Sequence, residues 1–122
     1  MQISIFSFGH KHGLPDEADL LFDARILPNP YYVPELKDKT GREPEVAAYA
    51  MNNEVGNKFQ QQVLALLHFL LPEYLRIEKE KVVIGVGCTG GRHRSVALAE
   101  AISKKLSETY PDIQLHHRDI GK

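Results

Sequence analysis

Short apolar runs along the chain predict four β-strands. Residues 2–8 alternate apolar side chains on two sides, which suits a strand with both faces partly covered. Residues 20–22 form a second short apolar run that leads into a polar loop. The near-continuous run of Val and Ile at residues 82–86 is typical of a central strand that is buried on both faces. Residues 113–117 alternate apolar and polar side chains, which favours an edge strand.

Helical spacing of apolar residues predicts three helices. Pro44 suits the first turn of a helix that runs to about residue 52, and Gly56 is expected to separate this helix from the next. Residues 57–71 carry an apolar stripe, and Pro72 is expected to end or kink this second helix. A third helix is predicted from about residue 94, and the proline at position 111 marks its end. The apolar stripes consist of Phe59, Val63, Leu66, Leu67, Leu70 and Leu71 in the second helix and of Leu98, Ile102 and Leu106 in the third.

The order of these elements predicts an α/β fold with a mostly parallel or mixed sheet of about four strands flanked by helices. With 122 residues, the chain is expected to form one domain over residues 1–122. Ligands of such sheets gather at the carboxyl ends of the strands. We therefore expect the loops at residues 9–13, 25–29 and 88–95, which all follow strands, to meet at one end of the sheet.

Composition and charge indicate an ordinary globular domain. Hydrophobic residues make up 43% and charged residues 25%, so neither disorder nor a fibrous repeat is indicated. The net charge of −1 gives no global attraction to nucleic acid or anionic membranes. No apolar run approaches the roughly 18 residues of a membrane span, and the N-terminus resembles a strand rather than a signal peptide, so a cytoplasmic location is expected. A single cysteine excludes an internal disulfide and fits a reducing compartment.

The segment from Cys88 to Ser95 lies between the predicted central strand and the third helix. Gly90 and Gly91 allow a positive φ and a close approach of the backbone to a bound group, while the start of the helix offers free N–H groups. Arginine side chains match phosphate oxygens bidentately. The segment therefore predicts a backbone-and-arginine cradle for a phosphorylated ligand. Its expected contacts are Thr89, Gly90, Gly91, Arg92, His93, Arg94 and Ser95.

A simpler interpretation of the same segment is a tight turn, with Ser95 as a helix cap and the arginines in solvent. The concentration of glycines, arginines, a histidine and hydroxyls within so short a segment favours the ligand site. GxxxxGK[ST] occurs nowhere in the chain, and we do not interpret the segment as a dinucleotide-binding fingerprint, so ATP hydrolysis by this chain alone is not expected.

Cys88, Arg94 and Ser95 also resemble the CX5R(S/T) loop of cysteine-dependent protein phosphatases, in which a thiolate attacks phosphorus and the arginine holds the equatorial oxygens. Gly87 stands where those enzymes usually carry a histidine, and no general acid is evident. The other interpretation of Cys88 is a small buried residue at a strand end. We expect a binding domain with no catalytic residue, and the alternative is a phosphatase that uses Cys88 and Arg94. Its candidate proton donors are Asp16, Asp23 and Asp119.

Two weaker groups of candidates remain. The histidines at positions 10, 12, 116 and 117 suggest a metal site, but such residues more often serve as polar loop sequence or ligand contacts, so no metal or other cofactor is expected. Asp23, Arg25 and Asn29 lie in the proline-bounded stretch DARILPNP. This stretch is either a functional loop or a structural turn with a buried Asp23–Arg25 pair, and both interpretations stay open.

Three motifs resemble the C-terminal domain of the bacterial RapZ/YvcJ family. They are SFGHKHG at residues 7–13, DARILPNP at residues 23–30 and GCTGGRHRS at residues 87–95. The stretches TGREPEV and HRD extend the resemblance over nearly the whole chain. It implies a regulatory domain that binds a phosphorylated amino sugar or a similar sugar phosphate and, in some members, contacts regulatory RNA as an adapter for a ribonuclease. The ligand contacts that it implies are Lys11, Arg25, Asn29, Thr89, Gly90, Gly91, Arg92, His93, Arg94 and Ser95.

Full proteins of that family carry a P-loop nucleotide-binding domain ahead of this one, whereas this sequence starts directly with the C-terminal type of domain. Either the gene is standalone or the sequence is a piece of a longer protein. The near-neutral charge and the lack of a long basic tail make RNA binding weak and salt-dependent. The expected partners are a sugar phosphate, weakly bound RNA, a separate P-loop protein and further copies of the chain in a homo-oligomer. The candidate RNA contacts are Lys11, Arg92, Arg94, Lys104 and Lys105.

Overall fold

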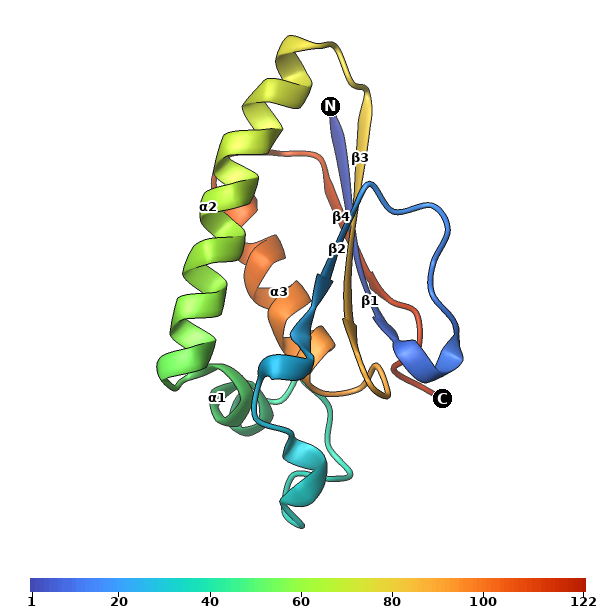
Figure 1. Cartoon of the computed structure of the whole chain (residues 1–122), viewed down its shortest axis with the longest axis vertical. Coiled ribbons are helices and arrows are strands. Elements are labelled where there is room, and N and C mark those ends of the chain that lie inside the picture. The colour runs from blue at the N-terminus through green and yellow to red at the C-terminus, as the bar shows by residue number, and fades with distance from the viewer.

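A computed structural model describes residues 1–122 and shows a four-stranded sheet in which all strands are parallel. The strands are β1 (Gln2–Gly9), β2 (Leu20–Asp23), β3 (Lys81–Cys88) and β4 (Ile113–His117). Their order across the sheet is β2-β3-β1-β4, so β1 and β3 are central and β4 is an edge strand, as predicted. The parallel arrangement places every strand's carboxyl end at the same end of the molecule (Figure 1).

The three α-helices cover one face of the sheet, with α3 between α2 and the strands (Figure 1). They are α1 (Pro44–Met51), α2 (Glu54–Arg76) and α3 (Arg94–Leu106). Short 3-10 helices η1 (His10–His12), η2 (Ala24–Ile26) and η3 (Pro30–Tyr32) lie near the carboxyl end of the sheet. None of the helices combines the length and the apolar character that crossing a bilayer requires.

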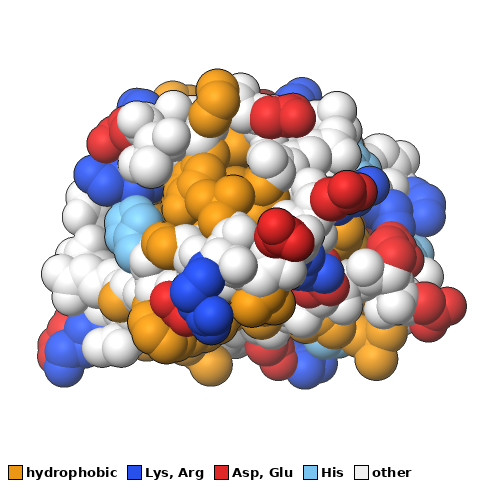
Figure 2. All heavy atoms as spheres, turned by 90° about the horizontal axis from the view of Figure 1, so that it is seen from above, with side chains coloured by type: hydrophobic (Ala, Val, Ile, Leu, Met, Phe, Trp, Pro, Cys, Tyr) orange, Lys and Arg blue, Asp and Glu red, His pale blue; other side chains and the backbone are white.

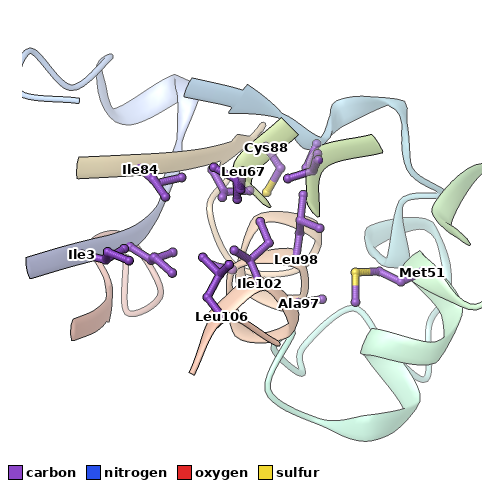
Figure 3. Close-up of a cluster of buried hydrophobic side chains, with 14 of the residues drawn as sticks. Ile3, Met51, Leu67, Ile84, Cys88, Ala97, Leu98, Ile102 and Leu106 are labelled. Carbon is purple, nitrogen blue, oxygen red and sulfur yellow. The ribbon is translucent and has the colours of Figure 1, made fainter. Parts of the chain in front are cut away.

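Two helical apolar stripes and the inner face of the sheet form the core. Ile3 and Ile84 from the sheet face Leu98, Ile102 and Leu106 of α3, and all five side chains are at most 1% exposed (Figure 3). The i, i+4, i+8 spacing on α3 explains this contact, because it places these side chains on one face of the helix. From α2, only Val63, Leu67 and Leu71 of the predicted stripe are fully buried.

The helix α2 differs from the sequence prediction at two positions, Gly56 and Pro72. Gly56 lies inside the first turn and does not separate the helices; a Cβ there would come within 2.3 Å of the Met51 carbonyl oxygen, so glycine permits the close approach of α1. Pro72 does not end the helix, which continues to Arg76. Leu71 and Tyr74 pack against the core on either side of Pro72, and this packing offsets the missing backbone hydrogen bond.

The opposite end of the molecule, where the strands begin, has a different surface character. Figure 2 shows apolar side chains gathered in the middle of this end, with acidic and basic side chains scattered around them. The last turns of α2 reach this end, and the exposed apolar residues in and after them are Phe69, Leu75 and Ile77.

The second face of the sheet is built on two phenylalanines that lie over glycines. Phe6 and Phe8 point away from the helices and are each 1% exposed. A Cβ at Gly85 would come within 3.0 Å of the Phe6 ring, and a Cβ at Gly87 within 2.5 Å of the Phe8 ring. The glycine at position 87, where cysteine phosphatases usually carry histidine, thus has a packing reason.

Gly87→Ala is expected to lower the free energy of unfolding by about 1–3 kcal/mol, because the new methyl group overpacks the Phe8 ring. Gly121→Ala is the matched control, since a Cβ there meets no atom within 4 Å. Urea unfolding of both variants and the parent measures the effect. Equal stability of Gly87→Ala and the parent would contradict the packing role of this glycine.

Candidate functional site

The three loops that were predicted to meet do so at the carboxyl end of the sheet. The Lys11 amide donates a hydrogen bond to the Thr89 carbonyl at 3.2 Å, which joins η1 to the loop after β3. The Arg94 side chain donates from Nη1 to the carbonyls of Arg25 at 3.0 Å and Leu27 at 3.3 Å. This convergence confirms the predicted arrangement and follows from the parallel sheet, because residues 9–13, 25–29 and 88–95 all continue from strand ends.

These loops surround a cavity of about 380 Å³. Its lining contains five cationic side chains and one carboxylate, so a net positive charge faces any ligand. An anion is the kind of ligand that this lining favours. The lining residues are Lys11, Asn29, Tyr31, Tyr32, Lys37, Asp38, Cys88, Thr89, Gly90, Arg92, His93, Arg94 and Lys122.

The backbone of the loop after β3, which contributes Thr89, Gly90, Arg92 and His93 to the cavity lining, has unpaired donors. The amide N–H groups of Thr89 to His93 lie outside the helices and strands, and none of them donates a hydrogen bond within the protein. Gly91 has φ +80° and packs so closely that a Cβ would come within 2.6 Å of the Gly9 amide nitrogen. Successive free amides around such a turn form a concavity suited to anions. The local conformation therefore agrees with the phosphate cradle expected from the sequence.

Arg94 combines a bracing contact with an unused donor. The residue is 6% exposed, and besides its two carbonyl contacts its Nη2 donates to Thr89 Oγ1 at 3.3 Å. Its Nε is buried and has no hydrogen-bond partner. A buried guanidinium N–H is rarely left unpaired, because the loss of hydration is then uncompensated. Arg92 and Arg94 both line the cavity, and the Nε of each is buried without a hydrogen-bond partner.

His93 and Arg92 hold one wall of the cavity. His93 Nε2 lies 3.0 Å from the Lys37 carbonyl, and Arg92 Nη2 donates to the Asp38 carbonyl at 3.3 Å. The Gly41 amide donates to the Arg92 carbonyl at 2.8 Å. Burial lowers the pKa of His93, although its contacts with the carbonyls of Lys37 and Lys39 act in the opposite direction. His93 was predicted as a ligand contact, and the structure shows its Nε2 engaged with the protein.

Cys88 lies at the floor of the cavity, next to α3. Its side chain is buried, with Sγ 3.1 Å from Ser95 Oγ. Ser95 itself is 0% exposed and does not line the cavity. The serine hydroxyl therefore contacts the thiol and not the space in which a ligand would lie.

Arg25 is directed away from the cavity by a neighbouring carboxylate. Its Nε and Nη2 donate to Asp23 Oδ1 and Oδ2 at 2.9 and 2.7 Å, and this contact lowers the pKa of Asp23 to about 2. Both side chains are about half exposed, so the pair is a structural turn at the surface and not the buried pair considered above. Of the predicted ligand contacts, Arg25, Gly91 and Ser95 do not line the cavity, whereas Lys11, Asn29, Thr89, Gly90, Arg92, His93 and Arg94 do.

The three candidate proton donors all lie outside the cavity lining. Asp16 is exposed, and Asp23 is engaged with Arg25. Burial raises the pKa of Asp119, but hydrogen bonds from Arg118, Gly9 and Lys122 outweigh this effect and hold the pKa well below its usual range. Asp23 and Asp119 are therefore ionised at neutral pH and cannot donate a proton to a leaving group.

No group of three or more His, Cys, Asp or Glu side chains lies close enough to hold a metal ion. His10 instead approaches Asp23, with Nε2 3.9 Å from Oδ1, and its ring lies against Phe8 at a centroid distance of 5.2 Å. The His117 ring contacts two side chains: its Nδ1 lies 2.7 Å from Ser7 Oγ, and its Nε2 lies 2.7 Å from Glu100 Oε2. Its neighbour His116 stacks on Phe6 at a centroid distance of 5.4 Å, so these two adjacent histidines have separate environments.

Several lining residues were not predicted from the sequence. Tyr31 and Tyr32 present half-exposed and exposed rings, and Lys37 Nζ lies 4.7 Å from the Tyr31 ring centroid. The adjacent tyrosines after DARILPNP were a usable signal, because aromatic residues beside a polar loop often contact ligands. Asp38 and Lys122 carried no local signal, and only the tertiary structure brings them to the cavity.

Comparison with known proteins gives consistent matches over the whole chain. Residues 1–121 match the family model described as the RapZ C-terminal domain. Proteins named "Nucleotide-binding protein" are similar to the chain: one from Lachnoclostridium phytofermentans is 52% identical and one from Limosilactobacillus fermentum 44% identical, each over 98% of the chain. A third, from Clostridioides difficile, is 50% identical. The chain spans 42% of the length of each of these three relatives.

The burial of His93 predicts a pH dependence of stability. Because the folded state lowers the pKa of His93 below the ordinary 6.5, protonation favours the unfolded chain, and the free energy of unfolding falls as the pH drops below about 6.5. His93→Gln, whose amide can still donate to the Lys37 carbonyl, is expected to show a smaller loss between pH 7 and pH 5. Denaturant unfolding across this range measures the slopes. The exposed His68→Gln is the control, and equal slopes in all three proteins would contradict the prediction.

Proposed function

Because the chain belongs to the RapZ C-terminal domain family, we propose that its cavity binds a phosphorylated sugar, with a hexosamine phosphate as the leading candidate. The domain then acts as a regulatory sensor and not as a catalyst. The observation that carries this proposal is the convergence of unpaired donors on one cavity. Thr89, Gly90, Arg92 and His93 line the cavity, and their amide N–H groups donate no hydrogen bond within the protein.

Charge and size support a phosphate monoester as the ligand. Five cationic side chains against the single carboxylate of Asp38 suit a dianion. A cavity of about 380 Å³ is at the small end of the range for small-molecule sites, which fits one sugar ring with its phosphate. The rings of Tyr31 and Tyr32 offer apolar surface on which the carbon face of a sugar can pack. Asp38 offers a carboxylate for hydroxyl or amine groups.

A sensor role agrees with the way the site is built into the fold. The ligand-facing loop contacts the wall at Lys37–Gly41 and the loop at Arg25–Leu27 through Arg92, His93 and Arg94. A ligand that pairs with the free donors would therefore stabilise the contacts between these loops. In proteins as long as the relatives, such a change can be passed to the parts of the chain outside this domain.

RNA binding is a second proposed role that can coexist with ligand sensing. Lys104 and Lys105 are exposed on α3 and can reach a nucleic acid backbone, whereas Arg94 is 6% exposed and cannot. With few accessible cations, the affinity for RNA is expected to be low and to fall steeply with salt.

Loss of a guanidinium from the cavity should weaken sugar-phosphate binding strongly. Arg94→Ala and Arg92→Ala are each expected to cost on the order of 2–5 kcal/mol of binding free energy, because a desolvated phosphate loses its charged partner. Calorimetric titration with a hexosamine 6-phosphate, a hexose 6-phosphate and inorganic phosphate measures the change. Arg76→Ala, on the exposed surface of α2, is the matched control.

The stability of each variant is checked by thermal unfolding, because Arg94 also braces two loops. Arg92 makes one side-chain hydrogen bond and is therefore the cleaner probe. If Arg92→Ala binds all three ligands with the same affinity as the parent, the proposed site is refuted.

A cysteine-dependent phosphatase is the alternative function, and one observation favours it. Cys88 lines the same cavity, and Ser95 Oγ lies 3.1 Å from its Sγ, where the hydroxyl could stabilise a thiolate. Against it, neither Asp23 nor Asp119 can act as the acid, so that role would fall to Asp38, the one carboxylic side chain on the lining. The binding function therefore remains the preferred proposal.

Cys88→Ser separates the two functions. In a binding domain the sulfur is a small side chain at a strand end, so the variant should keep sugar-phosphate affinity within about tenfold of the parent. Neither protein should release phosphate from p-nitrophenyl phosphate between pH 5 and pH 8. Steady turnover by the parent that disappears in Cys88→Ser would decide for the enzyme, because serine without an activating base is a poor nucleophile.

A further inference from the structure

The segment Arg118–Lys122 after β4 folds back against the loops of the cavity. In Figure 1 this end of the chain lies beside η1 at the carboxyl end of the sheet. The Arg118 amide donates to the Ser7 carbonyl at 3.0 Å, and Arg118 Nη2 contacts the Gly13 carbonyl at 2.6 Å. The segment is therefore anchored on both sides of η1.

Asp119 is the buried centre of this segment. Its side chain is 0% exposed, and Oδ2 accepts a hydrogen bond from the Gly9 amide at 2.7 Å. A Cβ at Gly91 would come within 2.9 Å of the Asp119 Cβ, so the carboxylate lies directly behind the ligand-facing loop. Arg118 contacts the same carboxylate at 2.8 Å. Asp119 is thus fixed relative to both Gly9 and Gly91.

Lys122 connects this buried carboxylate to the cavity. Its Nζ donates to Asp119 Oδ1 at 2.9 Å, and the residue lines the cavity together with Lys11 and Gly90. An ammonium group has more N–H donors than one carboxylate contact uses, so donors remain for a ligand. We infer that Lys122 is a phosphate-contacting cation of the cavity and that Asp119 is the positioning residue that holds it there. This inference rests on the proposed function.

The charges around Asp119 leave Lys122 available to an anion. Arg118 and Lys122 share the one carboxylate, so the three side chains together keep a positive charge. The competing interpretation is an ion pair that only fastens the end of the segment. The Lys122 side chain is 53% exposed, whereas its partner Asp119 is buried. The two interpretations therefore differ in what the loss of Lys122 changes: a phosphate contact predicts weaker ligand binding, and a fastening ion pair predicts a loss of stability alone.

Lys122→Met, Lys122→Arg and the control Lys104→Met are compared by calorimetric titration with inorganic phosphate at low ionic strength. Lys104 is exposed on α3 and does not line the cavity. We expect about tenfold weaker phosphate binding for Lys122→Met, recovery to within about threefold of the parent for Lys122→Arg, and no change for Lys104→Met. Parent-like affinity of Lys122→Met would overturn the assignment.

Asp119→Asn tests the positioning role in two backgrounds. If Asp119 acts through Lys122, the substitution should weaken phosphate binding by about tenfold in the parent and much less in Lys122→Met. Equal losses in both backgrounds would overturn this role. If Asp119→Asn does not fold, the parent provides the test: the side-chain ¹⁵N resonance of Lys122 should shift on addition of phosphate while that of Lys104 stays in place. A Lys122 resonance that does not move would overturn the inference.

Arg92→Ala distinguishes failure of this inference from failure of the proposed function. Phosphate binding that depends on Arg92 but not on Lys122 would overturn the Lys122 assignment alone. Absence of any phosphate or sugar-phosphate binding by the parent would overturn both.

Discussion

Burial of the Arg94 guanidinium is the constraint on which the site depends. A charged group that is 6% exposed needs compensation, and the carbonyls of Arg25 and Leu27 supply part of it. Meeting this need brings the loop after β2 to the loop after β3, and the cavity forms between them and the wall at residues 31–41. The Nε of Arg94 has no partner, so the compensation within the protein is incomplete.

Glycines make the close approaches possible. Gly9, Gly41 and Gly91 each lie where a Cβ would come within 2.6 Å of a backbone atom, so the loops pack backbone against backbone. This packing leaves the amides of Thr89–His93 directed at no protein acceptor. The same loop could hold a phosphate for binding or for transfer, and the difference lies in its surroundings. Asp23 and Asp119 are ionised by their cationic neighbours, which favours binding over catalysis.

Membership in the RapZ C-terminal domain family fits a domain whose task is recognition. The matching relatives are more than twice as long as this chain, so the domain is one part of those proteins. The loop after β3 is connected through side chains to residues 25–27 and 37–38, and through a backbone hydrogen bond to η1. The Asp119–Lys122 pair extends that network to the last residues of the sequence.

The sequence by itself determined the strands and the α/β class, because these depend on local signals such as the apolar runs of β1 and β3. The glycines and arginines between Cys88 and Ser95 indicated a phosphate-binding loop, which stays a prediction. The motifs at residues 7–13, 23–30 and 87–95 also indicated the family. The tertiary structure decided what local signals cannot contain. Gly56 lies inside α2 because it permits the close approach of Met51, and Pro72 lies inside α2 because packing of Leu71 and Tyr74 outweighs its local helix-breaking tendency. The Arg25 side chain contacts Asp23 and does not line the cavity, whereas Lys122 does. The sequence could not predict either position, because contacts between distant segments form only when the sheet brings the loops together.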